Sequence, residues 1–208
     1  MLKTLKIAFP LAILSLLLFQ ACDNKNGNRF PISPELIENN SELVTYGKRI
    51  YGNSIATASR GYFRNMEEED IVFGQEVMNK NDWGIKFILT ELEGDTLSEV
   101  YSTQLLEGSL KKNSILTVSV NTLGRDLLYY DSRDFFLGNS GGEVFIYLFD
   151  FKSQIIYKGH LYILDDGIPN LFLNGYSRNN FADTIITEKM TAMFPELKKT
   201  QSDFRFEY

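Results

Sequence analysis

The sequence predicts one α+β domain, in which an N-terminal helical segment and a short C-terminal helix flank a mainly antiparallel β-sheet. Three observations lead to this prediction. Apolar residues recur at helical spacing after Ser33, strand-like runs fill the region from Ile71 to Leu164, and helical spacing returns after Asp183. Short turns between successive strands favour antiparallel pairing, and helices at the two ends of the chain can cover such a sheet.

The N-terminal helical segment begins at Ser33-Pro34-Glu35, which supplies a capping serine, a first-turn proline and an acid near the positive end of the helix dipole. Its apolar positions continue at roughly helical spacing as far as Phe63. Asn39-Asn40-Ser41 can divide the segment into two helices, with Ser41 capping the second. We interpret the acidic run from Glu67 to Asp70 as a solvated turn.

The first strands of the sheet follow Ile71. Alternation marks one of them: Ile85, Phe87 and Leu89 alternate with Lys86, Ile88 and Thr90. Glu93-Gly94-Asp95 supplies a turn, after which residues 97–105 can return as the hairpin partner. A helix is the alternative there, because Thr96-Leu97-Ser98-Glu99 also fits a capping box. Residues 115–120 form a short β-branched strand.

The clearest hairpin joins residues 144–151 to residues 155–164 through Lys152-Ser153-Gln154. Its first strand is apolar on both faces, so we expect it to be central and covered on both sides. A final helix begins at Asp183 or Thr184 and ends or kinks at Pro195. Its apolar residues are Ile186, Met190, Met193 and Phe194. Alternating aromatic and charged residues from Phe204 to Tyr208 predict a short edge strand.

Residues 1–21 have the pattern of a secretory signal. Lys3 and Lys6 give a basic start, and the apolar stretch that follows is too short to span a membrane as a helix. The next segment, Leu18-Phe19-Gln20-Ala21-Cys22, resembles the lipobox of bacterial lipoproteins. The resemblance implies transfer of diacylglycerol to the Cys22 thiol, cleavage before Cys22 and usually acylation, such as palmitoylation, of the freed amine. Two or three acyl chains make membrane attachment stable.

The domain organisation follows from this signal. Residues 1–21 are the signal peptide, residues 22–32 a lipidated flexible tether rich in polar residues, and residues 33–208 a single globular domain. Loss of Lys3 and Lys6 leaves 19 basic and 27 acidic side chains, a net charge of −8. This acidity argues against a nucleic-acid partner. Cys22 is the only cysteine, so the fold depends on a packed core rather than on disulfides.

One short motif resembles a catalytic one. Gly138-Asn139-Ser140-Gly141-Gly142 is similar to the nucleophile segment of chymotrypsin-like and HtrA-type serine proteases, in which Ser140 would be the nucleophile. That family places its histidine base well before the serine, whereas the sole histidine of this chain, His160, follows it. We therefore interpret the motif as a glycine-rich turn that leads into the strand at Val144.

The other candidate residues are carboxylates and His160. Glu143 with Asp165 or Asp166 could form an acid–base pair, but Asp165-Asp166-Gly167 is first of all a turn sequence. Asp165, Asp166 and Asn170 lack the spacing of a calcium loop. We expect His160 to face solvent or to be satisfied by a neighbour, because one histidine without cysteines cannot complete a zinc site. We thus expect neither a metal nor another cofactor.

The aromatic residues Trp83, Tyr129 and Tyr130 could offer a stacking surface for sugars or peptides, and the alternative is that they belong to the core. The leading expectation for function is a non-catalytic binding or accessory module that contacts a protein or glycan partner. The alternatives are a carboxylate-based hydrolase of cell-envelope glycans and a structural component of an envelope assembly.

The sequence after the lipobox bears on localisation. Asp23 resembles the inner-membrane retention signal of enteric bacteria. The Asn-rich tether resembles those of Bacteroidota lipoproteins, for which outer-membrane sorting is usual. It lacks the dense acidic run that resembles a surface-export signal in that group. We therefore expect a lipid-anchored protein of the cell envelope, at the outer membrane and facing the periplasm.

Overall fold

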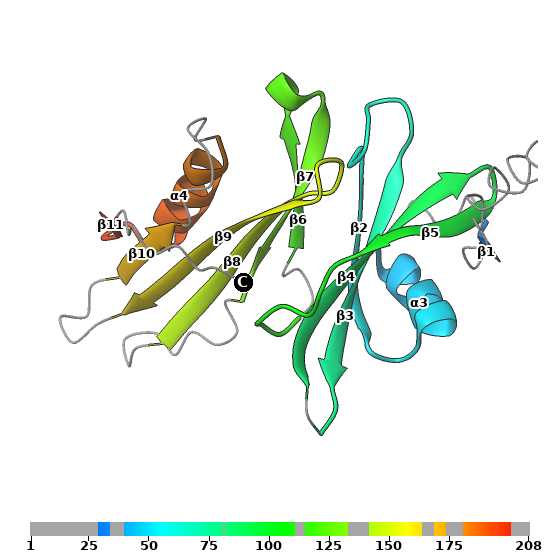
Figure 1. Ribbon diagram of the computed structural model, residues 1–208, viewed down its shortest axis with the longest axis horizontal. Coiled ribbons are helices and arrows are strands. Elements are labelled where there is room, and N and C mark those ends of the chain that lie inside the picture. The colour runs from blue at the N-terminus through cyan, green and yellow to red at the C-terminus, as the bar shows by residue number, and fades with distance from the viewer. Residues whose placement is uncertain are drawn as a thin grey trace, which may run out of the picture.

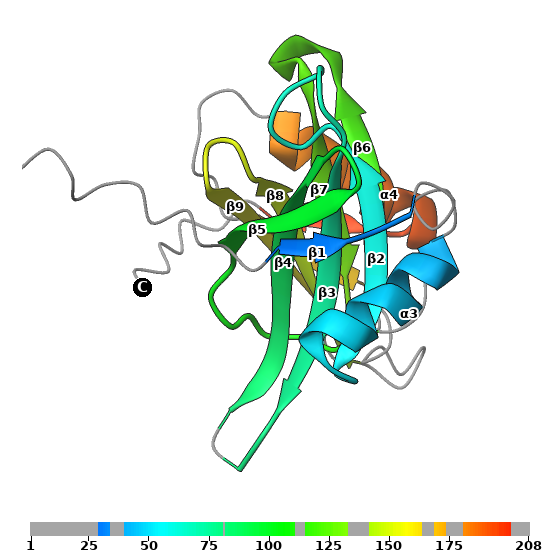
Figure 2. The same cartoon turned by 90° about the vertical axis from the view of Figure 1, so that its right-hand side faces the viewer.

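Two β-sheets pack against each other, and each carries one helix on its outer face (Figures 1 and 2). The computed structural model describes residues 29–33, 40–80, 82–110, 115–132, 142–163, 169–173 and 181–200. The layers therefore follow the order helix, sheet, sheet, helix. The expected combination of helices with a mainly antiparallel sheet is confirmed in this coarse form, with strands outweighing helices and two sheets in place of one.

The first sheet has the strand order β1-β5-β4-β3-β2, and all of its neighbouring strands are antiparallel. Its strands are β1 (Arg29–Pro31), β2 (Ile55–Gly61), β3 (Asp70–Met78), β4 (Trp83–Glu93) and β5 (Thr96–Ser102). Helix α3 (Asn40–Tyr51) lies between β1 and β2 in the chain and covers the outer face of this sheet through Leu43 and Tyr46.

The second sheet has the strand order β11-β10-β9-β8-β7-β6, and only the pairing of β10 with β11 is parallel. Its strands are β6 (Ile115–Val120), β7 (Arg125–Asp131), β8 (Gly142–Asp150), β9 (Ile155–Ile163), β10 (Pro169–Leu173) and β11 (Lys198–Thr200). A short 3-10 helix, η1 (Asn121–Leu123), joins β6 to β7. Helix α4 (Phe181–Met193) covers the outer face of the sheet through Ile186 and Met190.

The core between the sheets is rich in aromatic side chains. Phe87 from β4 packs against Phe149 from β8, with ring centroids 4.8 Å apart and planes inclined at 60°. Neighbouring residues on β8 point to opposite faces, so Leu148 packs under α4 while Phe149 faces the first sheet. The prediction that this strand is central and covered on both sides is confirmed, because β8 lies between β7 and β9.

The prediction of helix as far as Phe63 is wrong. Helix α3 ends at Tyr51, and Gly52 follows in the left-handed region at φ 96°, where its amide donates to the carbonyl of Lys48. Residues 55–61 then form β2. Their apolar residues fit a helix and a strand equally well over so short a run, and pairing with β3 decides between the two. The first predicted cap, Ser33-Pro34-Glu35, lies largely outside the described residues.

Other local predictions have mixed outcomes. Residues 29–31, assigned to the tether, instead form β1 and pair with β5, and Ile32 is buried behind them. Thr96 begins strand β5, so the alternative of a helix at this point is wrong. The predicted strand at residues 115–120 is confirmed as β6, and the final helix as α4, which begins at Phe181. Residues 204–208 lie outside the described part of the chain.

The two sheets are joined where β2 runs beside β6 and β7. The Thr117 hydroxyl donates to the carbonyl of Arg60 and lies 2.7 Å from the Ser59 hydroxyl. A few residues on, Asp126 donates its backbone amide to the carbonyl of Tyr62 and accepts the Tyr62 amide on its carboxylate, each at 2.9 Å. These bonds link the edges of the two sheets into one continuous corner.

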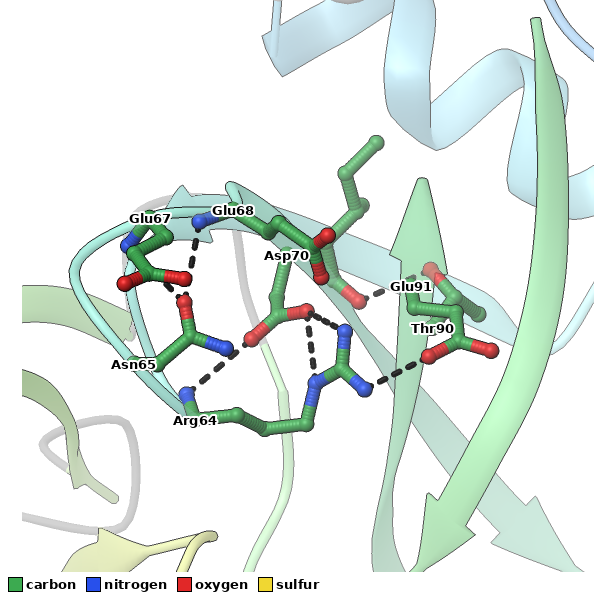
Figure 3. A network of polar contacts seen from close by, with 8 residues as sticks. Arg64, Asn65, Glu67, Glu68, Asp70, Thr90 and Glu91 are labelled. Carbon is green, nitrogen blue, oxygen red and sulfur yellow. Dashed lines mark hydrogen bonds and ion pairs between the residues drawn. The ribbon is translucent and has the colours of Figure 1, made fainter. Parts of the chain in front are cut away.

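The acidic run after β2 is only partly a solvated turn (Figure 3). Glu67 and Glu68 are exposed, and their backbone amides donate to the Asn65 side chain. Asp70 is instead fully buried as the first residue of β3, which corrects the prediction for this position. The chain turns back on itself here, and Arg64 reaches across the turn to Asp70.

Arg64 holds two carboxylates at once. Its side chain lies 2.7–2.9 Å from the Asp70 carboxylate and 2.6 Å from Glu91 on β4, and its backbone amide also donates to Asp70. Burial raises the pKa of Asp70, and the bonds from Arg64 offset this only in part. A single cation thus supports two acids, one of which has no access to water.

Replacement of Arg64 by leucine tests this arrangement. We expect Arg64→Leu to lower the free energy of unfolding by about 3 kcal/mol at pH 7, because Asp70 is left buried and unpaired. A carboxyl whose pKa is higher in the folded than in the unfolded state gains stability as pH falls. The loss should therefore be smaller at pH 5 than at pH 7 in urea titrations.

The control is the Arg60–Glu69 pair, which is 3.9 Å long and about one-third exposed at both ends. Arg60→Leu should change the stability by less than about 1 kcal/mol at either pH. If Arg64→Leu lowers the free energy of unfolding equally at pH 7 and pH 5, the loss does not come from leaving the Asp70 carboxylate unpaired.

Candidate functional site

A row of aromatic side chains crosses the inner face of β8, β9 and β10, beyond the closely packed core. We call Phe145, His160, Tyr162 and Phe172 the aromatic row. The strand register places Phe145 opposite His160, and His160 opposite Phe172. Residues directly opposite each other in a sheet lie on the same face, and so do residues two apart along one strand, such as His160 and Tyr162. All four rings therefore share the face that Tyr147 and Phe149 occupy further along β8.

The rings contact one another in sequence across the strands. Phe145 and His160 stack with centroids 4.9 Å apart and planes 13° apart, and Tyr162 and Phe172 stack at 4.8 Å and 3°. His160 also contacts Tyr162 at 5.3 Å with a tilt of 55°. Each ring thus limits the rotation of its neighbour, so the surface is held in shape before any ligand arrives.

A carboxylate–imidazole pair lies within the row. The Glu143 Oε2 atom is 2.9 Å from His160 Nε2, and the side chains of these residues are 52% and 34% exposed. His160 is therefore satisfied by a neighbour, which is one of the two outcomes expected from the sequence. Chemically, the pair offers a hydrogen-bond acceptor and an imidazole whose orientation is fixed by Glu143 and by the stacked Phe145 ring.

The aromatic row begins where the core between the sheets ends. Tyr147 and Phe149 are buried by the first sheet, whereas all four members of the row are only partly buried. The sheet order gives the reason: β6 is the edge strand that runs beside β2 of the first sheet, and β9 and β10 are three and four strands away from β6 (Figure 1). The row is thus an extension of the aromatic core into a surface that water reaches.

The other candidate residues divide into three groups. Tyr129 and Tyr130 are buried in the core, so the hypothesis that they form a stacking surface is wrong. Trp83 is 50% exposed at the end of the β3–β4 hairpin and does not join them. Asn170 is buried beside Tyr162 in the register. The remaining candidates lie outside the described residues: Cys22, Ser140, Asp165 and Asp166.

Two further properties concern the described part of the chain. Among these residues, no three His, Cys, Asp or Glu side chains gather closely enough to hold a metal ion. No helix within the same ranges has both the length and the apolar character needed to cross a membrane.

Comparison with known proteins gave no match: no protein-family model, no curated protein and no solved structure is similar to the chain.

If the aromatic row is a surface and not part of the core, its substitution should cost little stability. We expect Tyr162→Ala to lower the free energy of unfolding by less than about 1.5 kcal/mol, because the ring is already partly in water. Phe149→Ala, in the core, should cost about 3–5 kcal/mol. Urea titrations measure both. Similar losses would mean that the row serves to stabilise the fold.

Proposed function

We propose that the protein is a membrane-anchored envelope lipoprotein that acts as a non-catalytic binding module, and that the aromatic row is its contact surface. A glycan is the partner that this surface fits best. The observation that supports the proposal is a pre-ordered row of partly exposed rings with a carboxylate and an imidazole among them. Recognition surfaces commonly combine apolar rings with a few fixed polar groups.

The chemistry of the row explains the preference for a glycan. Sugars have C–H faces, which pack on aromatic rings, and hydroxyls, which donate to carboxylates and accept from imidazole. Tyr162 and Phe172 supply ring surface, while Glu143 and His160 supply acceptor and donor sites within one strand spacing. The acidic chain also disfavours anionic partners such as nucleic acid.

Membrane attachment is proposed from Cys22 alone. Replacement of Cys22 by serine removes the thiol that would carry diacylglycerol, so we expect the variant to leave the membrane fraction. Cell fractionation with immunoblotting of the wild type and Cys22→Ser measures this. Continued membrane retention of Cys22→Ser would contradict lipid anchoring.

Affinity capture tests the binding surface. The intact lipoprotein is immobilised and exposed to envelope extract, and the retained glycans and proteins are identified by mass spectrometry. We expect a glycan to be retained, with affinity roughly threefold to tenfold lower for Tyr162→Ala and for Phe172→Ala, because each substitution removes one ring contact.

The matched control is Tyr62→Ala, which removes a 37% exposed tyrosine from the loop between β2 and β3. It should retain the glycan as well as the wild type does. If a protein is retained in place of a glycan, and Tyr162→Ala and Phe172→Ala abolish its retention, the aromatic row is still the contact surface but its partner is a protein. Retention that is insensitive to Tyr162→Ala and Phe172→Ala would contradict the proposed surface.

The Glu143–His160 pair favours one second candidate, a hydrolase that acts on the bound glycan. A carboxylate that orients an imidazole is a recurring feature of general-base catalysis. Incubation of the captured glycan with the wild type and with Glu143→Gln separates the two functions. Cleavage by the wild type that is lost in Glu143→Gln would favour the hydrolase, whereas an intact glycan supports a binding module.

A further inference from the structure

The β3–β4 hairpin ends in an exposed apolar pair. Met78 lies opposite Trp83 at the last register position, and their exposed fractions are 76% and 50%. Beyond them, two hydrogen bonds join Asn79 and Asp82: Asn79 donates its amide to the Asp82 carbonyl at 2.9 Å and accepts the Asp82 amide on its side chain at 2.8 Å. Figures 1 and 2 show this hairpin projecting past the neighbouring strands. We call Met78, Lys80, Asp82 and Trp83 the hairpin tip.

The charge of this segment differs from that of the rest of the chain. The hairpin tip contains one basic residue, Lys80, and one acidic residue, Asp82, so its net charge is zero, in a mature chain whose net charge is −8. Most of the acidic surface should be repelled by anionic lipid headgroups. The hairpin tip lacks this net negative charge and carries tryptophan, a side chain that favours the interface between a bilayer and water.

The start of the described chain lies within reach of the same plane. Arg29 in β1 pairs with Ser98, which pairs with Glu91, eight residues along β4 from Trp83. That separation is about 27 Å along the strand. The seven residues 22–28 span up to about 24 Å when extended. The extended tether thus ends roughly 3 Å short of the level of Trp83, and the acyl chains of Cys22 and the hairpin tip meet one membrane surface when the Trp83 and Met78 side chains enter the bilayer interface by that depth.

From these observations we propose that the hairpin tip inserts Trp83 and Met78 into the interface of the bilayer that anchors Cys22. This inference rests on the lipid anchoring proposed above. A second contact point would fix the orientation of the domain, which a flexible tether alone leaves open. The end of the two sheets that carries the aromatic row would then face the membrane, because strands β4 and β8 both begin toward the bottom of Figure 1.

The single tryptophan of the chain makes the contact directly measurable. The intact lipidated protein is reconstituted into phosphatidylethanolamine–phosphatidylglycerol vesicles, with or without bromine on the acyl chains. Trp83 is the only tryptophan, so all tryptophan emission comes from the hairpin tip. We expect a blue-shifted emission maximum and quenching by the brominated lipid. Met78→Asp, which keeps the tryptophan, should reduce the quenching, because it places a charge at the interface.

A relocated tryptophan is the control. In Trp83→Phe with Tyr62→Trp, the sole tryptophan sits in the loop before β3, about 27 Å along β3 from the hairpin tip, and should not be quenched. Flotation of the vesicles separates the two proposals. Protein that floats while Trp83 stays unquenched would overturn the tip contact and leave the anchor. Protein that fails to float would overturn both, since the tip contact requires the anchor.

Discussion

The corner where β2 meets β6 and β7 fixes the position of every other surface of the molecule. Asp126 exchanges two hydrogen bonds with the backbone of Tyr62, and Thr117 bonds to the backbone of Arg60. Gly61 lies between these contacts. A β-carbon there would come within 2.8 Å of Thr117 and 3.0 Å of Asp126, so only glycine lets the strands approach this closely. Because the sheets are joined at this edge, their inner faces enclose the aromatic core and diverge toward β10.

Buried ion pairs reinforce the end of the sandwich that carries this corner, and they do so in two different ways. Asp150 is also buried, but its own cation, Arg125, binds it through two nitrogens at 2.8 and 2.6 Å. Burial opposes ionisation of Asp150, yet Arg125 and Ser153 outweigh it and hold the pKa below its usual value. Asp70 shares Arg64 with Glu91, and there burial outweighs the bonds from Arg64, so the pKa of Asp70 is raised. The opposite end of the sandwich carries the aromatic row and the hairpin tip instead.

Local sequence patterns predict the strands that have strong alternation or a clear turn. They give the wrong secondary structure where pairing with a strand distant in the sequence decides between helix and strand. The hairpin of β8 and β9 was predictable because both faces of β8 are apolar and a polar turn follows. Residues 55–61 were predicted as helix because a short apolar run fits both periods, and only pairing with β3 selects the strand. The burial of Asp70 could not be foreseen from an acidic run, since it depends on Arg64 folding back across the turn.

Part of the aromatic row can be predicted from the alternation of residues along the strands. The row's residues on β8 and β9, with Glu143 beside them, follow from alternation once the turn at residues 152–154 fixes the register. Phe172 does not, because β10 was not predicted. The outer face of β8 stays apolar along its length, with Val144 and Ile146 under the layer formed by α4. The inner face changes from Phe149 and Tyr147 to Phe145 and then Glu143. Toward Glu143, the inner face of β8 thus becomes polar while the outer face stays apolar. The first sheet no longer covers the inner face at this end of β8, which is why the candidate surface lies there.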